Sequence, residues 1–266
     1  MEQVLDVYKR PLDPRHPVIC MDESPKQLIA KTRMPIPCRP GQPAKYDYEY
    51  CRCGTCNIFL ACEPLAGKRI VEITERRTRQ DWARFLEIIA GSYPDAKIIT
   101  LVMDNLNIHT PGSFYETFLP EVAKAFWDRF EFILTPKHGS WLNIAEIELS
   151  VLYSQCLDRR IADIEEVQNE VKAWEEARNN KVARVNWQFT TADARVKLAR
   201  LYPTFDSWRS TRTFEVIKSQ SQVNTIRSDH PRLISSHMMG RYHHISVMQV
   251  LSMIVGKLVA FQIRWF

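Results

Sequence analysis

The most constraining feature of the sequence is the run IITLVM at residues 98–103, which leads directly into Asp104-Asn105. Such a run is typical of a strand that is buried on both faces and ends where a polar loop begins. In an open α/β sheet, ligands bind at the carboxyl ends of the strands. Asp104 is therefore either a turn residue or a functional acid at the end of a buried strand.

A second acid follows an apolar run near the N-terminus. Residues 18–21, VICM, precede Asp22-Glu23, which again indicates a buried strand with an acid at its end. Successive side chains of a strand point to opposite faces, so only one of these acids can face a given site. We assign that position to Asp22, because Glu23 precedes Ser24-Pro25 and could equally serve the following turn.

The rest of the chain alternates short β-type runs with helical patterns. Three short runs separated by glycine-containing segments predict an antiparallel meander. Helical spacing, Gly91 as a helix stop and Pro120 as a break define the helices. The expected strands cover 18–21, 46–50, 57–62, 69–73, 98–103 and 130–134, and the expected helices cover 78–90, 111–128, 141–160, 164–180 and 190–202.

A third acid, Glu146, falls on the helix after the last strand, for which Ser140 is a suitable N-cap. Glu146 lies near the apolar stripe of that helix, whereas Glu148 is expected closer to the solvent side. This order of elements is that of a ribonuclease-H-like α/β domain, with a mixed five-stranded sheet and helices on both faces. There the first strand neighbours the strand after the first helix, so we expect Asp22 beside Asp104.

Three acids at one place predict metal-dependent chemistry. Adjacent carboxylates raise each other's pKa unless a cation lies between them. Hard oxygen ligands with open positions suit Mg²⁺ or Mn²⁺. A third acid would complete a site for two ions, one activating the attacking oxygen and one stabilising the leaving oxygen of a phosphoryl displacement.

Three segments carry a family resemblance: 18–28 (VICMDESPKQL), 101–109 (LVMDNLNIH) and 135–149 (TPKHGSWLNIAEIEL). They resemble the acidic motifs of DDE transposases in the bacterial insertion-sequence branch related to mariner, within the retroviral-integrase and ribonuclease-H-like superfamily. Similar sequences also carry a segment like 187–203 near their end. Three ordered motifs make chance agreement improbable.

The resemblance implies metal-dependent DNA strand cleavage and strand transfer at insertion-sequence ends. It implies that Asp22, Asp104 and Glu146 bind two Mg²⁺ or Mn²⁺ ions. The implied partners are transposon ends and target DNA, with a dimer as the active form, in a bacterial cytoplasm at the nucleoid. The motif residues expected to support the site or contact DNA are Asn105, His109, Lys137, His138 and Asn143.

The resemblance also sets the expected domains, which are a lead-in at 1–17, a DDE catalytic domain at 18–205 and an irregular tail at 206–266. Such transposases normally begin with helix-turn-helix domains that read the transposon ends, so we expect that part to be separate or missing. The alternative is a catalytically silent, truncated remnant that regulates by binding DNA or a full-length transposase.

Charge and cysteine content limit the partners. Residues 206–266 hold eight Lys/Arg against three Asp/Glu, which equals the whole formal net charge of +5. DNA bound to residues 1–205 must therefore be held by a local basic groove. The seven cysteines, an odd number without a preceding secretory signal, indicate reduced thiols in a cytoplasm. The apolar stretch 245–263 contains Lys257 and is a poor membrane span, so no membrane partner is expected.

Four cysteines leave a second alternative open. Cys51, Cys53, Cys56 and Cys62 lie close together in the sequence and could form a structural zinc site within a zinc-dependent binding module. Strand alternation would send several of them in opposite directions, which favours ordinary reduced cysteines.

Overall fold

The computed structural model describes residues 1–34, 36–45, 47–137 and 139–202. The predicted tail at 206–266 and the candidate residue His138 lie outside these described residues. Within them, no helix is long and apolar enough to cross a membrane.

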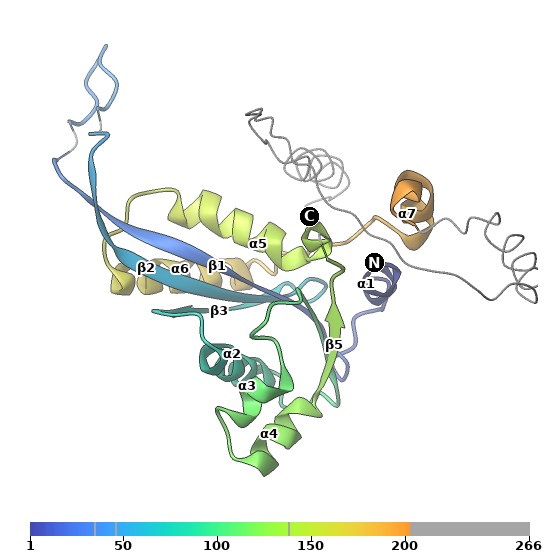
Figure 1. The fold of residues 1–266 in the computed structure, drawn as a ribbon. Coiled ribbons are helices and arrows are strands. Elements are labelled where there is room, and N and C mark those ends of the chain that lie inside the picture. The colour runs from blue at the N-terminus through green and yellow to red at the C-terminus, as the bar shows by residue number, and fades with distance from the viewer. Residues whose placement is uncertain (35, 46, 138, 203–266) are drawn as a thin grey trace, which may run out of the picture.

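A mixed five-stranded sheet forms the centre of the fold (Figure 1), in the order β3-β2-β1-β4-β5. β1 pairs antiparallel with β2, and β2 with β3, whereas β4 lies parallel to both β1 and β5. This order and direction are those of the ribonuclease-H-like fold, so the predicted fold class is confirmed. The strands are β1 (Val18–Lys31), β2 (Tyr50–Glu63), β3 (Lys68–Thr74), β4 (Ile99–Met103) and β5 (Phe130–Leu134).

The antiparallel part differs from the prediction in the length of its strands. β1 and β2 are long and pair as far as Lys31 and Tyr50, with an irregularity in register beside Leu28. Gly54 adopts a φ of +121° at this point, a conformation that glycine reaches without strain. The glycine was expected to mark a turn between two strands. Instead it lies at a bulge, and β2 continues through it.

Helices cover both faces of the sheet (Figure 1), with α2, α3 and α4 on one face and α5 and α6 on the other. The break at Pro120 is confirmed, because the helical stretch divides there into α3 and α4. The helices are α1 (Glu2–Val7), α2 (Arg79–Ser92), α3 (Pro111–Tyr115), α4 (Pro120–Trp127), α5 (Ile144–Leu152), α6 (Ile164–Asn180) and α7 (Thr191–Lys197). A 3-10 turn (Ser140–Leu142) precedes α5 and a π-helical turn (Tyr153–Leu157) follows it.

The core consists of two apolar clusters separated by the sheet. Alternate side chains of β1 enter different clusters: Cys20 faces α5 and α6, whereas Ile19 and Met21 face α2 to α4. This division follows from the two-residue repeat of a strand. Because the strands are buried on both faces, the apolar residues of each strand largely determine which part of it lies in the core.

Glu148 anchors α5 through a buried ion-pair network. Its side chain is fully buried, and its two carboxylate oxygens accept hydrogen bonds from Arg69 on β3 at 2.8 and 3.0 Å. Arg178 on α6 donates to the same two oxygens at 3.0 and 3.1 Å. Burial alone would raise the pKa of Glu148, but these two guanidinium groups outweigh it and lower the pKa. The expectation that Glu148 lies on the solvent side was wrong, because its cationic partners come from distant parts of the chain.

Glu148→Gln is expected to lower the free energy of unfolding by about 3 kcal/mol, because it removes the negative charge that the buried Arg69 guanidinium faces. The exposed pair between Arg159 and Glu170 provides the control, since Glu170→Gln should cost less than about 1 kcal/mol. Urea unfolding of both variants measures the difference. An equal loss of unfolding free energy in both variants would show that the buried network stabilises the protein no more than an exposed ion pair does.

Candidate active site

Asp22, Asp104 and Glu146 lie close enough for the charges of the other two to act on Asp22, although among the described residues their oxygens do not gather within 4.8 Å as one group. Asp104 directly follows β4, whereas Asp22 lies within β1, because that strand continues to Lys31 instead of ending before Asp22 as predicted. Cys20 on β1 lies opposite Val102 on β4, so continuing both strands by two residues brings Asp22 level with Asp104. Glu146 approaches from the first turn of α5. All three side chains are partly buried.

The electrostatics of these acids reflect their proximity. Burial raises the pKa of Asp22 to about 7, and the negative charges of Glu23, Glu146 and Asp104 add to that effect. Burial also raises the pKa of Glu146, with a further contribution from the charge of Asp104. Such mutual repulsion is typical of carboxylates arranged to share a cation.

Asn143 fixes the start of α5 relative to β1. Its buried side chain accepts a hydrogen bond from Ala145 N at 3.2 Å and donates one to Met21 O at 2.8 Å. Asn143 is thus the N-cap of α5, the position for which Ser140 was expected. Because Met21 precedes Asp22 on β1, the same amide fixes the first turn of α5, which carries Glu146, next to Asp22.

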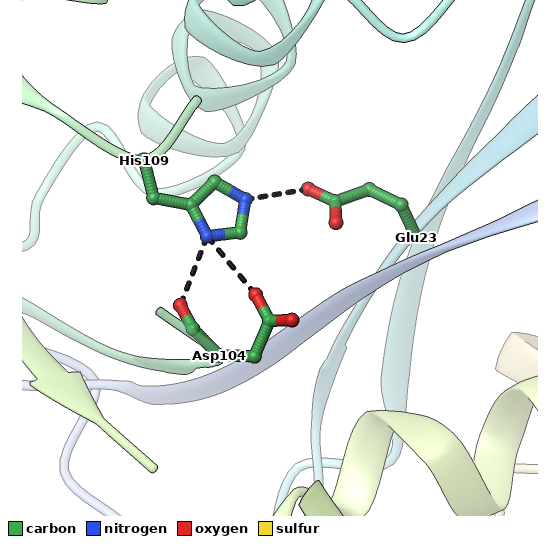
Figure 2. Close-up of side chains that lie close together, drawn as sticks. All are labelled: Glu23, Asp104 and His109. Carbon is green, nitrogen blue, oxygen red and sulfur yellow. Dashed lines mark hydrogen bonds and ion pairs between the residues drawn. The ribbon is translucent and has the colours of Figure 1, made fainter. Parts of the chain in front are cut away.

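His109 connects Asp104 to Glu23 (Figure 2). Its Nε2 lies 2.8 Å from Glu23 Oε1, and its Nδ1 lies 2.9 Å from the backbone oxygen of Asp104 and 3.2 Å from Oδ1 of the same residue. Burial alone would lower the pKa of His109, but Asp104 and Glu23 outweigh it and raise the pKa to about 9. His109 in turn lowers the pKa of Asp104.

Glu23 is a site residue that the sequence analysis missed. Its side chain and that of His109 are almost fully buried, with exposed fractions of 1% and 0%. The available signal was strand alternation, which sends Glu23 to the face opposite Asp22. The neighbouring Ser24-Pro25 left a turn role for Glu23 equally open, and the structure instead places Glu23 within β1.

The other described candidate residues take no part in the contacts between His109, Glu23 and Asp104. Asn105 and Lys137 are exposed on the loops after β4 and β5. Cys51 and Cys53 are exposed while Cys56 and Cys62 are buried. Within the described part of the chain, these cysteines do not form a group of metal-ligating atoms.

The metal-ligating atoms that do gather within 4.8 Å of one another, among the described residues, belong to Glu23, Asp104 and His109. Both nitrogens of His109 already make hydrogen bonds in this group. Oδ1 of Asp104 is buried and has no aligned hydrogen-bond donor, because Nδ1 bonds to the backbone oxygen instead. That oxygen faces the imidazole of His109 at 3.2 Å. The Asp104 carboxylate also lies near Asp22 and Glu146, and such a set of acids fits a hard divalent cation such as Mg²⁺ or Mn²⁺.

Asp22→Asn is expected to stabilise the metal-free protein by about 2 kcal/mol near pH 8. Because folding raises the pKa of Asp22, the wild-type protein is most stable at a pH below the ordinary carboxyl pKa. Its stability falls as the pH rises through about 7, the pKa in the folded state. The gain should therefore shrink as the pH falls and disappear below about pH 4, where the carboxyl group of Asp22 is protonated in both the folded and the unfolded state.

Thermal unfolding across this pH range, with the exposed Asp95→Asn as the matched control, measures the effect of Asp22→Asn. A cation at the site would offset the repulsion, so added Mg²⁺ should narrow the difference from the wild type. A gain that does not vary with pH would contradict the electrostatic origin.

Comparison with known proteins identifies the family that this chain matches. A family model described as DDE superfamily endonuclease matches residues 17–168. Among solved structures, the Mos1 transposase paired-end complex with left transposon end is 16% identical with a TM-score of 0.45, over 66% of this chain and 52% of that one. The Mos1 strand transfer complex is also 16% identical, with a TM-score of 0.44, over 68% and 55%.

The chain thus spans about half the length of these two transposase chains. A search of curated proteins found no match. The family match covers more than half of the 266 residues and includes Asp22, Asp104 and Glu146. The sequence resemblance to DDE enzymes is thereby confirmed, and the chain belongs to the DDE superfamily of endonucleases.

Proposed function

We propose that this chain is the catalytic domain of a transposase, which cleaves DNA strands at the ends of an insertion sequence and transfers them to target DNA. The observation that carries the proposal is the proximity of Asp22 on β1, Asp104 directly after β4 and Glu146 on α5, whose charges act on one another. Carboxylates in this arrangement suit phosphoryl transfer, in which catalysis depends on positioning and charge stabilisation.

Asp22, Asp104 and Glu146 are the residues that would hold two Mg²⁺ or Mn²⁺ ions. When bound, such ions activate the attacking oxygen and stabilise the leaving oxygen of an in-line displacement. The raised pKa of Asp22, about 7, implies that this carboxyl group releases a proton when a cation arrives. His109 holds the pKa of Asp104 low, so Asp104 is ionised before binding.

The proposed reaction has two phosphoryl transfers. In the first, a water oxygen bonds to the scissile phosphorus, the bond from phosphorus to the 3′ oxygen breaks, and that oxygen takes up a proton. In the second, the freed 3′-hydroxyl attacks a target phosphodiester and displaces another 3′ oxygen. Neither step changes an oxidation state, so no redox partner is needed.

The surroundings of the acids offer cationic and polar groups for the DNA backbone. Arg77, on the loop between β3 and α2, is exposed and lies close enough to lower the pKa of Asp104 by its charge. Lys137 and Asn105 are exposed on adjoining loops. Such side chains position the backbone of DNA without reading its sequence.

Recognition of a particular sequence requires more than these contacts. We therefore propose that a helix-turn-helix domain, separate from the described residues, reads the transposon ends, and that the active form is a dimer. In this proposal the protein works in the bacterial cytoplasm, at the nucleoid when bound to DNA.

Asp104→Ala is expected to abolish Mg²⁺-dependent nicking and joining of oligonucleotides that carry transposon ends. A metal-bound transition state is stabilised by several kcal/mol, so the loss should be roughly 10³-fold or more. Asp22→Ala and Glu146→Ala should have similar effects, and the exposed Asp95→Ala should have none. Gel assays of cleavage with and without chelator measure this, and activity that survives Asp104→Ala would refute the assignment.

Pre-cut ends separate catalysis from recognition. A catalytic domain without its DNA-reading part should still join pre-cut ends to target DNA in Mg²⁺ or Mn²⁺. A protein that binds DNA or a full-length transposase but never joins pre-cut ends would instead be the silent regulatory remnant.

A further inference from the structure

The pair formed by Glu23 and His109 is not explained by the three acids alone. Both side chains are buried, and their contact at 2.8 Å joins β1 to the loop after β4. Burying an ionisable pair is costly unless its hydrogen bonds are well formed. A buried pair at the base of a candidate active site therefore calls for a specific role.

The hydrogen-bond geometry defines what the imidazole ring does. Oxygen acceptors lie at both ring nitrogens, Glu23 Oε1 on one side and the backbone oxygen of Asp104 on the other. Both nitrogens are therefore occupied as donors, and neither is free to ligate a metal ion in this arrangement. Trp82 packs against the ring with centroids 5.1 Å apart, which further restricts its orientation.

Figure 2 shows that His109 lies between the two acids, Glu23 on β1 and Asp104 on the loop after β4. Glu23 is fixed by the pairing of β1 with β2, where it lies opposite Phe59. Asp104 lies just beyond β4, where no strand pairing restrains it. Through its two hydrogen bonds, the His109 ring connects Asp104, the first residue of the loop, to the paired strand that carries Glu23.

We propose that Glu23 and His109 are positioning residues that hold Asp104 in the orientation required for cation binding. This inference rests on the proposed function of Asp104 as a metal ligand. Adjacent residues of β1 then have separate tasks, since Asp22 faces the site while Glu23 braces its partner acid from the opposite face. Groups that orient metal ligands in this way typically change metal affinity by 10- to 100-fold.

The test measures Mn²⁺ binding to the purified full chain by electron paramagnetic resonance and calorimetry. Glu23→Leu removes the acceptor, and His109→Phe removes both donors while keeping a ring against Trp82. Each is expected to weaken Mn²⁺ binding by roughly 10- to 100-fold. Glu23→Gln keeps an oxygen acceptor and should restore affinity to within about threefold of the wild type, because the role of Glu23 is to hold the ring.

The double variant with Glu23→Leu and His109→Phe protects the test against misfolding. Replacing both partners by apolar groups leaves no unpaired buried group, so the double variant should fold even if a single variant does not. It should bind Mn²⁺ no more weakly than the poorer single variant, since the pair acts as one unit. Glu63→Leu removes a buried carboxylate elsewhere in the sheet and should leave Mn²⁺ affinity unchanged.

Two results would overturn the proposal. The first is a folded double variant with wild-type Mn²⁺ affinity, which would give the pair a purely structural role. The second is a loss in Glu23→Gln as large as in Glu23→Leu, which would make Glu23 a metal ligand itself. If the proposed function is wrong, the result differs from both of these, because the wild type would then bind Mn²⁺ without cleaving or joining DNA.

The same variants provide a kinetic check with pre-cut ends. Disturbed positioning of Asp104 should raise the Mg²⁺ concentration needed for half-maximal joining while the KM for DNA stays constant. An increase in the KM for DNA at unchanged Mg²⁺ dependence would place the pair in DNA binding and contradict the positioning role.

Discussion

The parallel register of β1 and β4 is the constraint on which the candidate site depends. Cys20 lies opposite Val102, and this pairing brings Asp22 level with Asp104 beyond the ends of the buried runs. Because side chains alternate along a strand, a slip of one residue would exchange Asp22 for Glu23 and transfer apolar residues to the wrong face. Both faces of β1 and β4 are covered by apolar clusters, so the core strongly opposes such a slip.

Local patterns were sufficient to predict much of this arrangement. The apolar run before Asp104 ends where β4 ends, so the position of this acid follows from the sequence itself. The run before Asp22 predicted the start of β1 but not its length, because β1 continues past Asp22 to Lys31, paired with β2. Pro120 separates α3 from α4 because proline cannot continue a helix across that position. The approach of Glu146 was predictable only through the order of elements, since its helix must pack on the sheet after β5.

Features that depend on distant partners could not be predicted in this way. Glu148 resembles a solvent-facing residue until Arg69 and Arg178 are brought to it by the fold. Glu23 resembles a turn residue until His109 reaches it from the loop after β4. Gly54 supports a turn or a bulge equally well, and only the pairing of β2 with β1 makes it a bulge.

Two pairs of nearby acids show the same division of tasks. Asp22 and Glu23 point to opposite faces of β1, and Glu146 and Glu148, two positions apart on α5, also point in different directions. In each pair one acid is buried with cationic partners, whereas the other is partly exposed with its pKa raised. The buried acids fix the strand and the helix, which lets the fold tolerate the repulsion among the site carboxylates. A cation at the site would relieve that repulsion, so the stability of the scaffold and the affinity for metal are linked through these neighbouring residues.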